Sequence, residues 1–109
     1  MTRYLISFPS GAMDHIPEEE SSEVARAAHA VVQEAKDAGV FFFAGGLDED
    51  VEPVMVADDG TVTPSTYPLG GFTIVDVTSR EAALEWAAKF AVACRCAQEV
   101  CEIGFDPLV

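Results

Sequence analysis

Apolar residues recur along the first third of the chain with two different spacings. Tyr4, Ile6 and Phe8 alternate with other residues within Arg3–Phe8, which predicts a strand that buries one face. From Pro17 to about Ala38 the apolar positions lie three and four residues apart, and three glutamates suit the first turn. This pattern predicts a long helix that ends at a glycine. Its apolar stripe consists of Val24, Ala28, Val31, Val32 and Ala35.

The middle of the chain carries shorter apolar runs that are typical of strands. Val40–Ala44 is continuously apolar and is bounded by glycines, which predicts a strand buried on both faces. Val54–Ala57 and Thr61–Thr63 flank the turn sequence Asp58-Asp59-Gly60. We expect these two runs to form a hairpin.

The last third repeats the order of strand, helix and strand. Leu69–Val77 predicts a strand without a polar face, and Glu99–Phe105 predicts a last strand. Between them, Thr78 and Glu81 fit a capping box, in which the threonine hydroxyl caps the helix. The apolar stripe of this second helix consists of Ala83, Trp86, Ala87 and Phe90.

This order of elements predicts one α+β domain over residues 1–109. It reads β-α-β, a hairpin, then β-α-β, which is the ferredoxin-like plan with two helices on one face of an antiparallel sheet. Two helices cover only one face, yet Phe41–Phe43 and Phe72–Val77 offer apolar side chains to both. Because an exposed apolar sheet face usually marks an association surface, we expect a homodimer that packs sheet against sheet.

Composition narrows the classes of partner. The net charge of −13 would repel nucleic acid and anionic membrane surfaces, so we expect neither as a partner. No apolar run approaches the roughly 20 residues of a membrane helix, and the three cysteines accompany no secretory pattern. We therefore expect a cytoplasmic protein.

Metal and cofactor sites lack their usual motifs. Cys94, Cys96 and Cys101 have no paired C-x-x-C spacing, and small buried side chains are the expectation for them. The acidic clusters Glu18–Glu20 and Asp48–Asp50 fit solvated surface, with cation binding as the alternative. The chain has no Rossmann fingerprint, phosphate-binding loop or nucleophile elbow, so we expect no cofactor and no tightly bound metal.

Three segments carry a resemblance to a known family. Ala28–Leu47, with the sequence AHAVVQEAKDAGVFFFAGGL, resembles the helix, glycine and strand block of YCII-related proteins, particularly those of the DGPF type. Thr63–Asp76 is similar to the family's loop and LGGF strand, and Glu81–Ala87 is similar to its EALEWA helix. The resemblance implies a dimeric α+β barrel, and related barrels include isomerase-like and dehydrochlorinase-like enzymes.

Histidine is the usual side chain for proton transfer near neutral pH, and the chain has two. YCII-related proteins have a histidine on the first helix and an aspartate near its end, and the resemblance implies His29 and Asp37 for these catalytic positions. His29 lies at the border of the helical stripe, about 12 Å along the helix from Asp37, so the two cannot bond directly. The alternative is a boundary histidine with only a structural role.

Two loops supply further candidates. His15, the third catalytic candidate, follows Asp14 in the loop after the first strand, where a ligand could be met. Asp14 could orient the imidazole or simply cap the helix region. Ser65 and Tyr67 are candidate substrate contacts in the motif-like loop, where turn chemistry around two prolines is the alternative.

Two hypotheses for function follow. The first is a cofactor-independent enzyme that performs isomerase-type or lyase-type proton transfer in a pocket between sheet and helices. The second is a non-catalytic small-ligand-binding or regulatory dimer, since DGPF-type proteins are often linked with transcription regulators. Convergent polar groups around a histidine in an open pocket would favour the enzyme.

Overall fold

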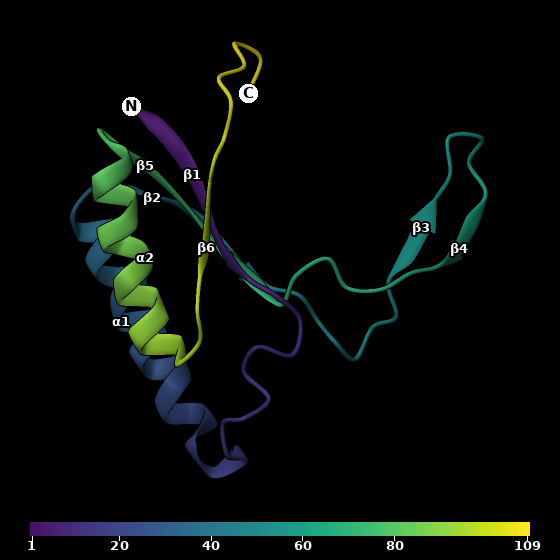
Figure 1. Cartoon of the computed structure of the whole chain (residues 1–109), viewed down its shortest axis with the longest axis horizontal. Helices are drawn as coiled ribbons and strands as arrows, with labels where there is room; N and C mark the ends of the chain where they lie inside the picture. The colour runs from purple at the N-terminus through teal and green to yellow at the C-terminus, as the bar shows by residue number, and fades with distance from the viewer.

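The computed structural model describes all residues from Met1 to Val109. Two helices pack on a four-stranded sheet, and a small two-stranded hairpin stands apart from them (Figure 1). The strands are β1 (Thr2–Phe8), β2 (Phe41–Gly46), β3 (Val54–Val56), β4 (Val62–Pro64), β5 (Gly71–Val77) and β6 (Glu99–Glu102). The helical elements are the 3-10 turn η1 (Glu18–Glu20) and the α-helices α1 (Ser21–Asp37) and α2 (Arg80–Cys94).

The four-stranded sheet is antiparallel throughout. Its strand order is β2-β5-β1-β6, so the first strand of the chain lies inside the sheet beside the last. Both helices lie on the same side of the sheet (Figure 1). The molecule is thus a small α+β protein, and its order of elements is compatible with the ferredoxin-like plan.

One hydrophobic core lies between the sheet and the helices. Ile6, Val75 and Val77 are almost completely buried there, as the alternation along β1 and β5 predicts. Ala83 and Phe90 of α2 pack on the same cluster. Burial of each large aliphatic side chain contributes about 1.5–3 kcal/mol, so this cluster is what holds α2 against the sheet.

The opposite face of the sheet, which we call the outer face, has no helix over it. The prediction that Val40–Ala44 is a strand buried on both faces is wrong for the single chain, because β2 is an edge strand with an irregular register. Phe41 pairs with Val75 but Phe43 pairs with Ile74, so an extra residue bulges out of the strand. Phe42 and Phe43 are 51% and 56% exposed.

Contacts across the outer face join side chains from three strands. The guanidinium of Arg3 lies 4.2 Å from the ring centre of Phe42, and its Nε lies 4.0 Å from Oδ2 of Asp76. The rings of Phe43 and Phe72 lie 5.9 Å apart between centres. The other carboxylate oxygen of Asp76 is buried without a hydrogen-bond partner. The outer face is therefore largely apolar, and one of its buried polar atoms has no hydrogen-bond partner.

The predicted hairpin forms as β3 and β4. It extends away from the sheet and helices (Figure 1), which widens the molecule to 44 × 43 × 19 Å. Its strands pair from Val54 opposite Pro64 to Val56 opposite Val62, and Met55 between them is also exposed. A two-stranded hairpin is marginal by itself, so these apolar side chains remain open to contact.

Several helix and strand ends differ from the predictions by one or more residues. The first helix is preceded by η1, and the last strand ends at Glu102, so Phe105 lies beyond it and is 92% exposed. The cap of α2 is Ser79, whose Oγ accepts a hydrogen bond from the backbone N–H of Ala82. The predicted capping by Thr78 is thus wrong by one residue. Neither helix is both long and apolar enough to cross a membrane.

Candidate functional site

An open cavity of about 630 Å³ separates part of the sheet from α1. Its lining is mostly apolar and comes from the loop after β1, both helices, β2, β5 and the segment after α2. The α1 residues that line it recur at helical spacing, from Ser21 near one end to Lys36 near the other. The cavity therefore runs along the helix as a groove beneath the sheet.

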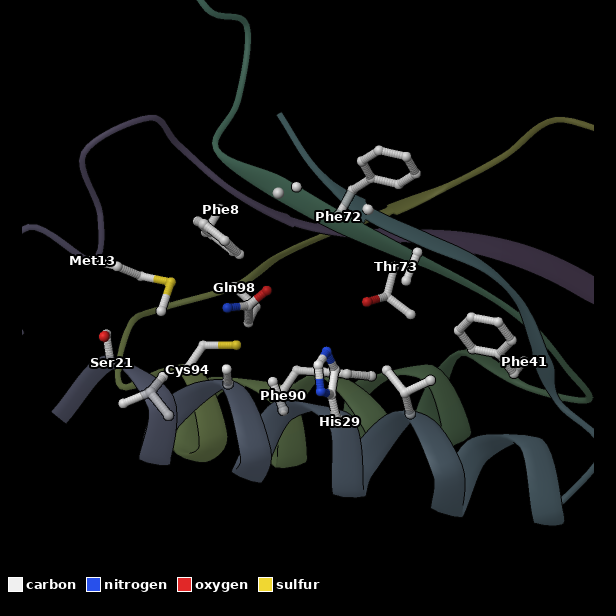
Figure 2. A pocket seen from close by; sticks show the side chains of 18 of the residues that line it. Phe8, Met13, Ser21, His29, Phe41, Phe72, Thr73, Phe90, Cys94 and Gln98 are labelled. Carbon is white, nitrogen blue, oxygen red and sulfur yellow. The ribbon is translucent and has the colours of Figure 1, made fainter. Parts of the chain in front are cut away.

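Glycines keep the sheet side of the cavity open. A side chain at Gly71 would place its Cβ only 2.7 Å from the ring of Phe8, and one at Gly70 would lie 2.9 Å from the same ring. Such distances are too short for carbon atoms, so both positions need glycine for the Phe8 ring to stay where it is. This is a physical reason for the Leu69-Gly70-Gly71-Phe72 sequence. Phe8 in turn forms one wall of the cavity (Figure 2).

Polar side chains from four elements point into this mostly apolar space. Figure 2 shows His29 rising from α1 toward the sheet, with Thr73 of β5 facing it from above. Cys94 at the end of α2 and Gln98 just before β6 point into the same space. Phe72 also belongs to the lining, although its ring projects from the far side of the sheet (Figure 2). An imidazole, a hydroxyl, a thiol and an amide thus point into one cavity, where they could orient a bound molecule.

The cysteines near this cavity are free thiols. Cys94 is buried, and this burial, with a smaller contribution from Cys96, raises the pKa of its thiol. Burial likewise raises the pKa of Cys96, although a hydrogen bond from Nε2 of Gln98 to its sulfur partly offsets the increase. Because the thiolate is the nucleophilic form, Cys94 contributes a weak polar surface to the cavity rather than a reactive group.

The first-helix candidates are separated by the fold. His29 lines the cavity, but Asp37 does not. The Asp37 carboxylate instead accepts a hydrogen bond of 2.9 Å from Nε2 of Gln33 on the same exposed surface. No aspartate or glutamate lines the cavity, so no carboxylate orients the imidazole there.

The loop candidates after β1 lie outside the cavity. His15 and Asp14 are both exposed in a run of turns. The backbone N–H of Asp14 donates to the carbonyl of Gly11, whose backbone is in the left-handed region at φ 83°. Of this loop, Met13 and Ile16 reach the cavity. The loop thus supplies an apolar edge rather than the histidine.

Ser65 and Tyr67 line a different, more open hollow at the base of the hairpin. The hydroxyl of Tyr67 donates a hydrogen bond to the carbonyl of Val51, which ties the two sides of the hairpin base together. Partial burial and the surrounding acidic residues Glu49 and Asp48 raise the pKa of this phenol. The two candidates therefore do not meet His29.

Thr73 and Gln98 are polar cavity residues that the sequence did not single out, and Cys94 was expected only as a small buried side chain. Thr73 occupies the helix-facing register of β5, between Gly71 and Val75, so strand alternation could have identified it. Gln98 follows the left-handed Arg95 that ends α2, and only the fold places this segment beside the cavity.

The cavity is the most distinctive feature of the structure, because neither a metal site nor a similarity to known proteins points to a function. No group of three or more His, Cys, Asp or Glu side chains is arranged to hold a metal ion. No protein-family model matches this chain, and no curated protein matches its sequence. Fold and site together define a small α+β protein with an open, mostly apolar cavity that contains one histidine.

Proposed function

We propose that this protein binds a small organic molecule in the cavity and that His29 transfers a proton to or from it without a cofactor. The observation that carries the proposal is that His29, although exposed, lines a mostly apolar, open cavity opposite the hydroxyl of Thr73. Histidine is the side chain that most often acts as a general acid or base. Isomerisation and elimination are the reaction classes that need only such a step.

The surroundings of His29 suit this role. Thr73 can donate to or accept from a carbonyl or hydroxyl of the bound molecule, and the Gln98 amide can do both. Phe8 and Phe90 provide apolar walls against which the body of a bound molecule can pack. A molecule held between these groups would present its reacting carbon to the imidazole.

A specific observation favours a second candidate function. No carboxylate lies in the cavity to orient His29, whereas catalytic histidines are commonly oriented by a third group. The alternative is a non-catalytic module that senses or carries a small ligand. Both candidates require the cavity, and they differ only in whether His29 exchanges protons with the ligand.

We also propose that the active form is a homodimer, with the outer faces of two sheets packed together as in a dimeric α+β barrel. The exposed Phe42 and Phe43 rings and the unpartnered oxygen of Asp76 support this arrangement. The resemblance to YCII-related, DGPF-type proteins points the same way. Most of the cavity lining comes from the helix side of the sheet, so the cavity should stay open in the dimer.

The free thiols and the net charge support a proposed cellular location and a class of partner. Three unpaired cysteines in a chain with a net charge of −13 fit a reducing compartment, and we place the protein in the cytoplasm. The same charge favours small molecules over nucleic acid or anionic membranes as partners.

Proton exchange in D₂O tests the enzymatic proposal directly. Wild-type protein incubated with a defined set of small keto acids and lactones should replace a carbon-bound proton next to a carbonyl by deuterium. Loss of that proton signal is followed by NMR. His29→Gln should slow the exchange about 100-fold or more, because general acid–base catalysis contributes about that much. His15→Gln, which changes an exposed histidine outside the cavity, is the matched control and should exchange at the wild-type rate.

Two results would count against the proposal. Equal exchange rates for wild type and His29→Gln would remove the catalytic role of the histidine. If wild type exchanges no proton but still binds compounds that Ala28→Trp excludes, the binding module is the correct function. Ala28 lines the cavity, so tryptophan there should fill it, whereas Ala30→Trp changes an exposed position of the same helix outside it.

A further inference from the structure

The cavity differs in charge from the rest of the protein. The chain has 19 acidic residues among 109, yet no acidic residue lines the cavity. Its charged or chargeable nitrogen groups are His29 and Lys36. The hollow at the hairpin base shows the contrast, because Glu49, Asp50 and Glu52 line it. The cavity is thus a neutral to basic space in a strongly acidic molecule.

Lys36 has no ion-pair partner within the chain, although acidic residues outnumber basic ones threefold. Lys89 and Arg95 are paired with Glu34 and Glu20, whereas Lys36 has no ion pair, as is also the case for Arg26 and Arg80, which do not line the cavity. The Lys36 ammonium instead lies 5.3 Å from the ring centre of Phe41, which also lines the cavity. Its charge is therefore held against an apolar wall and is free for a ligand.

The cavity also carries a cation at one end only. Lys36 lies seven residues after His29 on α1, about 10 Å along the helix axis. Figure 2 shows Phe41 at one end of the cavity, Met13 and Ser21 at the opposite end, and His29 between them. A molecule lying along the groove would thus meet a cation at one end, the imidazole in the middle and uncharged side chains, among them Met13, beyond it.

We propose that the cavity selects apolar molecules that carry a single carboxylate, with the carboxylate at Lys36 and the apolar body directed toward Met13. This proposal rests on the proposed function of the cavity and adds the class of ligand. Long-range repulsion by the net charge of −13 does not prevent it. At physiological salt, exposed charges more than about 8 Å away are largely screened, so the nearby ammonium dominates.

Three probes with the same apolar body test the selectivity. These are 4-trifluoromethylbenzoate, 4-trifluoromethylbenzamide and 4-trifluoromethylbenzylamine, which are an anion, a neutral molecule and a cation. Their dissociation constants are measured by ¹⁹F NMR at about 0.15 M salt. We expect the benzoate to bind most tightly and the benzylamine least. Lys36→Met should weaken the benzoate about fivefold, which corresponds to a partly exposed ion pair, and leave the benzamide unchanged.

A matched control separates Lys36 from a general change in surface charge. Lys89→Met also removes one lysine charge, but Lys89 pairs with Glu34 and does not line the cavity, so it should leave all three dissociation constants unchanged. Equal affinities of wild type for benzoate and benzamide, or equal benzoate losses in both variants, would overturn the carboxylate proposal. If Ala28→Trp still excludes the probes in that case, the cavity remains the binding site. Failure of all three probes to bind would contradict both the proposal that the cavity binds a small molecule and its proposed selectivity for carboxylates.

Discussion

At the residue scale, Cys94 shows how the fold sets the chemistry of a side chain. Its thiol is buried at the cavity wall, and this burial raises its pKa. When a thiol has a higher pKa in the folded state than in the unfolded state, its contribution to the stability of the fold is fully present at pH values below the unfolded pKa. That contribution is lost as the pH rises through the folded pKa. Cys94 therefore remains protonated and unreactive at neutral pH.

Alkylation kinetics test this state of Cys94. At pH 7.5, iodoacetamide should modify Cys94 at least tenfold more slowly in the native protein than in urea, because both burial and the raised pKa suppress the thiolate. Peptide mass spectrometry measures the rate at this residue alone. The native rate should increase as the pH is raised toward 10. Equal native and unfolded rates at pH 7.5 would show that the thiol is accessible and ionised.

Individual site residues differ in how well the sequence predicts them. His29 was a candidate from its border position on the helical stripe and from the family resemblance, and it does line the cavity. His15 and Asp14 were candidates by residue type and by their position in a loop, and the fold leaves them exposed outside the cavity. Gln98 had no signal, because its place depends on how the chain leaves α2. The spacing of residues along a helix predicts which of them share a face in the structure, whereas the sequence does not predict the course of a loop.

At the element scale, the sequence predicts which elements form better than where they end. The alternation along β1 and β5 places Ile6 and Val75 in the core, as expected. β2 departs from its prediction because a bulge and an edge position expose Phe43, and neither is visible in an apolar run. The cap of α2 is Ser79 rather than Thr78, since either of two adjacent hydroxyl residues can serve as an N-cap, although only Thr78 has a glutamate three residues later.

The two hydroxyls before α2 give a matched pair of substitutions. Ser79→Ala removes the acceptor for the Ala82 N–H and should lower the free energy of unfolding by about 1 kcal/mol. This corresponds to a decrease in Tm of about 4–8 °C for a domain of this size. Thr78→Ala changes an exposed residue that does not cap the helix, so its effect should stay within about 0.5 kcal/mol. Thermal unfolding followed by circular dichroism measures both, and a larger loss for Thr78→Ala would contradict the cap assignment.

At the scale of the whole molecule, two helices and one sheet leave an apolar face uncovered. The core lies on the helix side of the sheet, while Phe42 and Phe43 remain about half exposed on the outer face. Leu5 and Ile74 of the central strands, which pair with each other, extend this face across the sheet. A second copy would cover it and would leave the cavity on the opposite side accessible. The sequence predicted this imbalance because it depends only on the number of helices and on strand alternation.

The mass of the protein in solution tests the association of these faces. At about 10 µM, which exceeds typical dissociation constants of specific complexes, light scattering should give twice the protomer mass of 11.6 kDa. Phe43→Glu places a carboxylate in the packed face, where an unpaired charge costs several kcal/mol, so dimer affinity should decrease by at least 100-fold. Val92→Glu is the matched control, because Val92 is 80% exposed on α2, on the helix side of the sheet, and this variant should remain a dimer. Circular dichroism establishes that both variants are folded. A monomeric wild type, or a Phe43→Glu variant with undiminished association, would contradict packing through the outer face.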